Sequence, residues 1–190
     1  QQVYDWTIPK EWNIKDAWIK NSKGEKVIDF QVSNLHVVSY STPIHKKISF
    51  EELKGNLHYL ENIPEAIPYR TSYYNESWGF CVSYKQYQEL FQEGEEYEIR
   101  IDSKLSNGGL SIGEILIKGK SKKEYLISCY ICHPSMANDS LSGVTTTAFI
   151  AKELLKIQDT LECSYRIVFV PETIGAIAYC ANNEKAMKEI

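Results

Sequence analysis

The pattern of apolar and polar positions is clearest in residues 121–190, which read as strand, helix, strand, helix. Residues 124–132 are a mostly apolar run that predicts a central strand, and residues 165–170 predict a second buried strand. Between them, residues 140–157 carry apolar side chains at helical spacing, namely Val144, Ala148, Ala151, Leu154 and Leu155. A crossover helix makes the flanking strands parallel, so this segment predicts a βαβ unit.

Residues 1–120 have a different pattern, rich in Tyr, Trp and β-branched residues and broken by turn signals, which favours a β-rich unit. Three stretches are predicted to contain strands: a strand pair or one long bent strand over 26–41, a short strand over 78–82, and two strands, 97–101 and 111–117, around a turn at 106–109. Two short helices are expected to interrupt them, because Ser49 with Glu52 and Ser83 with Gln86 each fit a capping box. The two parts are expected to meet near residues 119–123.

Composition and charge narrow the possible classes. The 190 residues leave room for one ordinary domain or two small ones, and 43% hydrophobic with 24% charged residues excludes a disordered or collagen-like chain. Twenty-one Lys and Arg against 25 Asp and Glu give a formal charge of -4. No global positive field exists to attract phosphate backbones, so we expect no nucleic-acid partner.

The distribution of apolar runs and cysteines bears on location. The longest uncharged apolar stretch, residues 125–132, is far shorter than the roughly 18 residues that span a bilayer, so no membrane partner is expected. The five cysteines form an odd set, partly inside apolar runs, which favours reduced thiols in the core and a cytoplasmic protein. The chain starts at Gln1 and ends in a helix-like stretch, 183–190, so we expect it to be part of a longer protein.

Three polar residues follow the predicted strands at one edge of the sheet. His133 follows the first strand, Asp139 lies in the loop that opens the helix, and Glu172 follows the second strand. Parallel strands place such residues at a common edge, where imidazole and carboxylates are suitable ligands for zinc and a carboxylate can bridge two cations. Spacing alone allows an ordinary alternative: a strand-end histidine, an aspartate that caps the helix, and an exposed glutamate.

The segments around these residues are H-P-S-M-A-N-D-S-L-S-G-V at 133–144 and F-V-P-E-T-I-G at 169–175. Together they resemble the co-catalytic zinc aminopeptidase superfamily, in which a strand-end His binds one metal, an Asp bridges two, and an E-E-x-G segment supplies a general base and then a ligand. The resemblance implies that His133 is a ligand, Asp139 the bridge and Glu172 the base. Thr173 stands where the family has its second Glu, so either one metal has fewer ligands or Glu172 is itself the ligand; we favour the base role.

Further segments carry a closer resemblance: Y-D-W-T-I-P-K-E-W at 4–12, P-Y-R-T-S-Y-Y at 68–74, W-G-F-C at 78–81 and P-E-T-I-G at 171–175. They resemble bacterial aminopeptidase-like proteins associated with polysaccharide biosynthesis, whose peptidase fold is interrupted by a β-rich insert. The resemblance implies an α/β fold, a partial zinc-aminopeptidase-like (phosphorylase/hydrolase-like) sheet with an inserted β-rich subdomain. The implied parts are the start of the aminopeptidase-like domain at 1–12, the insert at 13–117 and the βαβ segment at 118–190, with the C-terminal half outside this chain.

The function implied by the resemblance is that of a zinc-dependent aminopeptidase-like hydrolase of peptide or amide bonds. We expect two zinc ions in the intact protein, a peptide or aminoacyl-type small substrate, and no activity from this piece alone. The alternative is a catalytically inactive metal- or carbohydrate-binding or assembly module in polysaccharide biosynthesis. An acidic residue and a His in the sequence downstream of this chain, able to complete two metal positions, would favour the enzyme.

Other motifs are weaker candidates. Cys129-Tyr130-Ile131-Cys132-His133 spells the haem c attachment sequence, but strand alternation would send the two cysteines to opposite faces, so we expect small core thiols. A thioredoxin-like C-x-x-C motif would have to open a helix, whereas Cys129 and Cys132 lie at the end of a predicted strand, so this interpretation is disfavoured. Ser142 has no base at a plausible spacing, which disfavours a serine hydrolase. The four Trp and 13 Tyr are expected in the core rather than on a sugar-stacking face.

Overall fold

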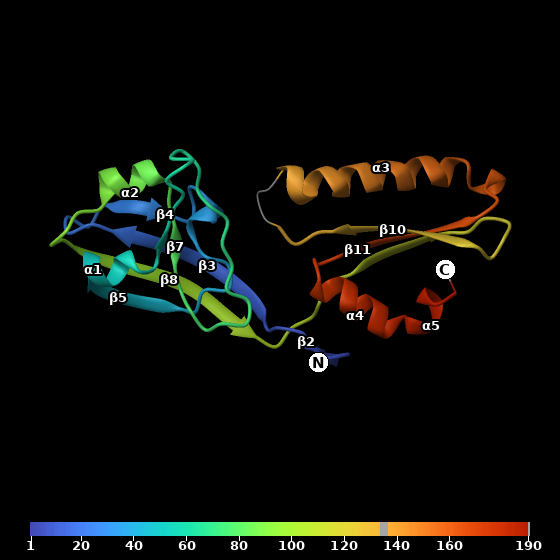
Figure 1. The fold of residues 1–190 in the computed structure, drawn as a ribbon, viewed down its shortest axis with the longest axis horizontal. Helices are drawn as coiled ribbons and strands as arrows, with labels where there is room; N and C mark the ends of the chain where they lie inside the picture. Colours follow the sequence, from blue (N-terminus) through green and yellow to red (C-terminus); the bar gives the residue numbers. More distant parts are fainter. Residues whose placement is uncertain (134–136, 190) are drawn as a thin grey trace. The chain divides into compact units, whose positions relative to one another are not determined.

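The computed structural model describes residues 1–133 and 137–189, which form two compact units (Figure 1). Unit 1 consists of Gln1–Ile8 and Gly109–Ile190, and unit 2 consists of Pro9–Gly108. The chain therefore passes from unit 1 into unit 2 and returns. It divides at 8/9 and 108/109 rather than at the expected 12/13 and 117/118, because the strand at 113–117 pairs within unit 1.

Unit 2 is built on a four-stranded antiparallel sheet with the order β4-β3-β8-β5. Its strands are β3 (Glu11–Lys20), β4 (Lys26–Asp29), β5 (Ile44–Ser49) and β8 (Glu96–Ser106). Alternation along β8 buries Tyr97, Ile99 and Ile101 on one face. The other face carries charged side chains, which is typical of an antiparallel sheet with one covered face.

The covered face packs against short elements that cross it. These are the 3-10 turn η1 (Asn34–His36), α1 (Phe50–Lys54), β6 (Leu57–His58), β7 (Phe80–Cys81) and α2 (Tyr84–Leu90). Both helices begin where the sequence predicts. The Ser49 hydroxyl caps α1 by accepting from Glu52 N–H, and α2 has the complete capping box of Ser83 and Gln86. One hydrophobic cluster, with Phe80, Ile99 and Leu53 at its centre, joins these elements to the sheet.

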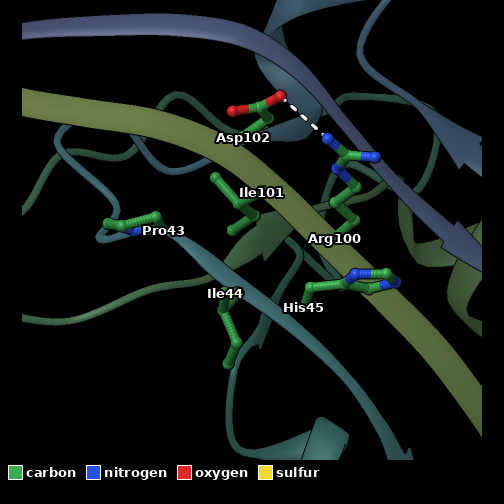
Figure 2. Close-up of a pocket in the computed structure, with 6 residues that line it drawn as sticks. All are labelled: Pro43, Ile44, His45, Arg100, Ile101 and Asp102. Carbon is green, nitrogen blue, oxygen red and sulfur yellow. Dashed lines mark hydrogen bonds and ion pairs between the residues drawn. The ribbon is translucent and has the colours of Figure 1, made fainter.

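The outer face of the same sheet has a shallow hollow between β5 and β8. Figure 2 shows the residues that line it: Pro43, Ile44, His45, Arg100, Ile101 and Asp102. The Arg100 guanidinium donates to Asp102 Oδ2 at 2.9 Å, and His45 Nε2 lies 2.9 Å from Glu98 Oε1 on the same face. Arg100 and Asp102 pair along β8, and His45 of β5 pairs with Glu98 across the two strands, so the hollow is a surface between paired side chains.

Unit 1 contains a three-stranded sheet with the order β10-β11-β9. Its strands are β9 (Gly113–Ile117), β10 (Glu124–Tyr130) and β11 (Ser164–Val170). The strands β10 and β11 are parallel and in register from Glu124↔Ser164 to Tyr130↔Val170, which confirms the predicted βαβ unit. A small hairpin of β1 (Gln2–Val3) and β2 (Trp6–Thr7) completes the strands of this unit among the described residues.

Helices cover both faces of the unit 1 sheet (Figure 1). The crossover helix α3 (Gly143–Lys156) lies on one face, and α4 (Ile174–Asn182) with α5 (Glu184–Met187) lies on the other. Alternation along β11 serves both: Ile167 packs with Ala151 of α3, and Val168 packs with Tyr179 of α4. The sheet is therefore the middle of three layers, and β11 is its best-covered strand.

Two expectations for the first part of the chain are wrong. Residues 97–101 and 111–117 do not form a hairpin, since β8 belongs to the sheet of unit 2 and β9 pairs antiparallel with β11 in unit 1. Residues 26–41 hold one short strand followed by a 3-10 turn rather than a strand pair or one long bent strand. In the first case the long-range pairing of β8 and β9 was not encoded locally. Among the described residues, no helix has the length and apolar character needed to cross a bilayer.

Candidate functional site

The carboxyl ends of β10 and β11 bring His133 and Glu172 together. His133 Nε2 lies 2.9 Å from Glu172 Oε2, and a carboxylate oxygen can only accept, so the imidazole N–H donates. The His133 side chain is 10% exposed and that of Glu172 is 45% exposed. The imidazole is thus held in place by its surroundings, while the carboxylate remains open to water.

Cys132 lies beside this pair. The Glu172 backbone N–H donates to Cys132 Sγ at 3.1 Å, which ties the end of β10 to the end of β11. One ligand atom from each of Cys132, His133 and Glu172 lies within 4.8 Å of the other two. Burial is the main cause that raises the pKa of the Cys132 thiol, and the nearby Glu172 and Asp139 carboxylates act in the same direction.

Asp139 joins the site through Tyr130, the last residue of β10. A hydrogen bond from the phenol to the Asp139 carboxylate raises the pKa of Tyr130. The Tyr130 ring also meets His133 edge-on, with 5.8 Å between ring centroids. Asp139 Oδ1 is buried and has no hydrogen-bond partner among the described residues. An unpaired buried carboxylate oxygen is costly, so this atom is suited to a cation.

The ordinary alternative for Asp139, a cap on the crossover helix, does not hold. The residue that precedes α3 is Ser142, and no side chain caps that end. Asp139 has an extended backbone with φ -115° and ψ 99°. Residues 134–136 of the H-P-S-M-A-N-D segment lie outside the described residues.

The glycines of the two segments, Gly143 and Gly175, lie where the backbone closely approaches neighbouring side chains. A side-chain carbon at Gly143 would come within 3.1 Å of Cys129 Sγ, and one at Gly175 would come within 2.6 Å of Pro171 Cδ. Thr173, between Glu172 and α4, has φ +54°, which is rare for a β-branched residue. Strained backbone of this kind is held only where surrounding contacts fix it, and here it immediately follows Glu172.

Sequence reasoning missed Tyr130 and Cys132 as members of the site. The prediction of core thiols holds for Cys129, which is buried beside Gly143, but not for Cys132, which is only partly buried and lies with the ligand atoms. Strand alternation could not place Cys132, because β10 ends at Tyr130 and the backbone bond from Ile131 N–H to Val170 O comes before Cys132. The available signal was its position next to His133.

Comparisons with known proteins support a peptidase-like relationship. A protein of Clostridium acetobutylicum named "Putative polysaccharide biosynthesis protein with aminopeptidase-like domain" is 51% identical over 189 residues, covering 100% of this chain and 43% of that protein. The chain is similar to an aminopeptidase-like protein. A crystal structure titled "putative peptidase", also from Clostridium acetobutylicum, matches with a TM-score of 0.93 and 51% identity, and covers all of this chain and 44% of that one. The chain thus spans less than half the length of these relatives.

Unit 2 has a separate match. Residues 11–104 match the family described as a domain of unknown function, DUF2172. The match lies within Pro9–Gly108, so it coincides with the compact unit that the antiparallel sheet organises. The candidate site belongs entirely to unit 1, the part of the chain outside that match.

The donor atoms at the site fit a divalent metal. Imidazole nitrogen, carboxylate oxygen and thiol sulfur are the atom types that bind zinc in proteins. The hydrogen that His133 donates to Glu172 lies where a cation could bind both residues. Asp139 Oδ1 is buried without a hydrogen-bond partner among the described residues. We therefore treat a metal as chemically compatible with these residues.

Proposed function

We propose that this chain carries part of the centre of a zinc-dependent, aminopeptidase-like hydrolase that cleaves peptide or amide bonds. One observation carries the proposal: His133 Nε2 and Glu172 Oε2 converge to 2.9 Å at the carboxyl ends of adjacent parallel strands. Catalytic groups commonly occupy that edge of an open α/β sheet. The similarity to aminopeptidase-like and peptidase-named proteins supports the reaction class.

In this proposal His133 and Asp139 hold the metal. His133 offers a ring nitrogen, and Asp139 offers the buried oxygen that lacks a partner among the described residues. A bound zinc ion supplies Lewis acidity, which polarises a carbonyl and makes water a stronger acid. Further ligands, including those for a second zinc ion, would come from outside this chain.

Glu172 is the proposed general base. Its half-exposed carboxylate takes a proton from the attacking water and passes it to the departing amine. Its backbone is fixed by the bond to Cys132 Sγ on one side and by the strained Thr173 on the other. This positioning orients a carboxylate toward the space beside His133, where a peptide or aminoacyl-type substrate would react.

The proposed fold is a partial zinc-aminopeptidase-like sheet, with unit 2 as an inserted β-rich subdomain. A second candidate function keeps the same geometry without turnover: a metal- or carbohydrate-binding module in polysaccharide biosynthesis. Thr173 favours this alternative, because its hydroxyl replaces the carboxylate that the aminopeptidase motif places there. The name of the Clostridium acetobutylicum relative points to the same cellular context.

A test in the intact protein separates these two candidates. Glu172→Gln should lower turnover by roughly 10²–10⁴-fold with zinc content unchanged, since that is what a positioned base contributes. His133→Ala should lower zinc content, measured by elemental analysis. Glu153→Gln, an exposed carboxylate on α3 that pairs with Lys156, is the matched control and should change neither quantity. If zinc-loaded wild type turns over no member of a broad aminoacyl and peptide panel, the binding module replaces the enzyme.

A further inference from the structure

We propose that Cys132 supplies a sulfur ligand to the metal, in place of the ligand that the aminopeptidase motif provides at the position of Thr173. The inference rests on the metal dependence proposed above, but it assigns a role that the aminopeptidase resemblance does not contain. The resemblance points to His133 and Asp139 as ligands and to no cysteine. Thr173 leaves that set one carboxylate short.

The position of Cys132 permits this role. Its Sγ lies within 4.8 Å of a ring nitrogen of His133, close enough for both to bind one cation, and a carboxylate oxygen of Glu172 lies within the same distance of both. The residue lies two positions beyond the end of β10 at Tyr130 and follows Ile131, whose N–H still donates to Val170 O, so the alternation of the strand does not fix the direction of its side chain. Two consecutive side chains can therefore approach the same point.

The surroundings of the sulfur also suit a ligand. The Glu172 N–H points at Cys132 Sγ at 3.1 Å, and an N–H donor stabilises negative charge on sulfur, the form that binds metals. Cys129, three residues earlier, instead packs against Gly143 and is not part of the group of ligand atoms.

A sulfur ligand would change which metal the site prefers. Thiolate selects zinc and other softer cations, whereas a site of carboxylates and water suits magnesium or manganese. With Cys132 and His133 binding the cation, the Glu172 carboxylate lies beside it, where a base would take a proton from water. The carboxylate ligand that the aminopeptidase motif has at the position of Thr173 is then replaced by the Cys132 sulfur, so the number of ligands stays the same.

X-ray absorption on the zinc-loaded intact protein tests the proposal directly. We expect a sulfur neighbour at about 2.3 Å beside nitrogen and oxygen neighbours at about 2.0–2.2 Å. Cys132→Ser should remove the sulfur neighbour and weaken zinc binding by more than about tenfold, since even indirect partners of ligands contribute that much. Cys180→Ser, which changes an exposed cysteine on α4, should leave the sulfur neighbour in place.

A second measurement avoids any variant, in case Cys132→Ser fails to fold. Alkylation followed by peptide mass mapping should show Cys132 modified in metal-free protein and protected by Zn²⁺, with Cys180 modified in both. Zinc bound through nitrogen and oxygen alone, or a sulfur neighbour that persists in Cys132→Ser, overturns the role of Cys132 and leaves the proposed hydrolase intact. Failure to bind zinc at all overturns both.

Discussion

The two units differ in how completely they bury their apolar side chains. Unit 2 encloses one large hydrophobic cluster, in which the rings of Phe50, Tyr87 and Phe91 pack together over the antiparallel sheet. Unit 1 has two small clusters, one on each face of β11. It leaves large apolar side chains exposed on β10 and α3, such as Leu126 at 45% and Phe149 at 59%.

Sheet type explains this difference. An antiparallel sheet needs cover on one face only, and the outer face of unit 2 is charged, with the hollow of Figure 2 lying among paired side chains. A parallel pair is normally covered on both faces, but β10 is an edge strand of the unit 1 sheet, and its face with Leu126, Ser128 and Tyr130 is exposed, while Ile127 and Cys129 are partly or fully buried on the other. Burial is therefore concentrated in unit 2, while chemistry-bearing residues are concentrated in unit 1.

The largest effect is expected in the centre of unit 2. Phe80→Ala removes a fully buried ring and should lower the free energy of unfolding by about 3–5 kcal/mol. Tryptophan fluorescence during denaturation is the measurement, because Trp12, Trp18 and Trp78 all lie in this unit. Val32→Ala, at a position 82% exposed, should be nearly neutral. Equal losses in the two variants would contradict the idea of one dominant cluster.

The contrast within unit 1 should be visible between adjacent strands. Ile167→Ala on β11 removes a fully buried side chain and should cost about 2–5 kcal/mol. Leu126→Ala on β10 should cost about 0.5 kcal/mol or less, because that side chain is already exposed to water. Loss of helical circular dichroism during denaturation reports on the helices, of which α3 is the longest among the described residues. A large loss from Leu126→Ala would show that β10 is covered in solution.

A smaller effect is expected where α4 approaches β11. Gly175→Ala places a carbon 2.6 Å from Pro171 Cδ and should cost about 1–3 kcal/mol through overpacking. Gly55→Ala in unit 2, which has a helical backbone and no atom within 4 Å, should be neutral or slightly stabilising. Thermal unfolding compares the two. Equal stability of both variants would mean that the α4 contact adjusts freely.

A modest pH dependence is expected from unit 2. His36 Nδ1 donates to Cys81 O at 2.8 Å, and burial lowers the pKa of the ring below its ordinary value of 6.5. The unfolded chain then binds more protons than the folded one. Stability should be full above about pH 6.5 and should fall as the pH drops toward the folded pKa.

The control for this prediction compares slopes rather than absolute stabilities. His36→Gln should flatten the decline of the unfolding free energy between about pH 6.5 and pH 5, measured by urea denaturation. His58, whose pKa burial also lowers, should account for part of the remaining slope. A wild-type stability that rises as the pH falls through this range would reverse the assigned direction.

Local signals predicted much of the fold and part of the site. Helical spacing between two apolar runs was sufficient to predict β10, α3 and β11. The capping pair Ser83 and Gln86 predicted the start of α2. The convergence of His133 and Glu172 followed from the rule for parallel strands. The partner of β9 could not be predicted, because pairing with β11 depends on residues about fifty positions away. Cys132 was missed because it lies beyond the end of β10, where strand alternation does not predict the direction of a side chain.

The route of the chain between the units has a consequence for how the protein folds. The segment 9–108 begins and ends on neighbouring strands, since Glu11 is opposite Ser106 in the β3–β8 ladder. Unit 1 needs contacts between its first strand, β1, and α4 near the far end of the chain. Closing a loop in an unfolded chain has an entropic cost that grows with the logarithm of the loop length. Once the β3–β8 ladder has formed, the chain that must close between β1 and α4 is effectively shorter. We therefore expect unit 2 to fold first and to bring the two segments of unit 1 closer together along the chain.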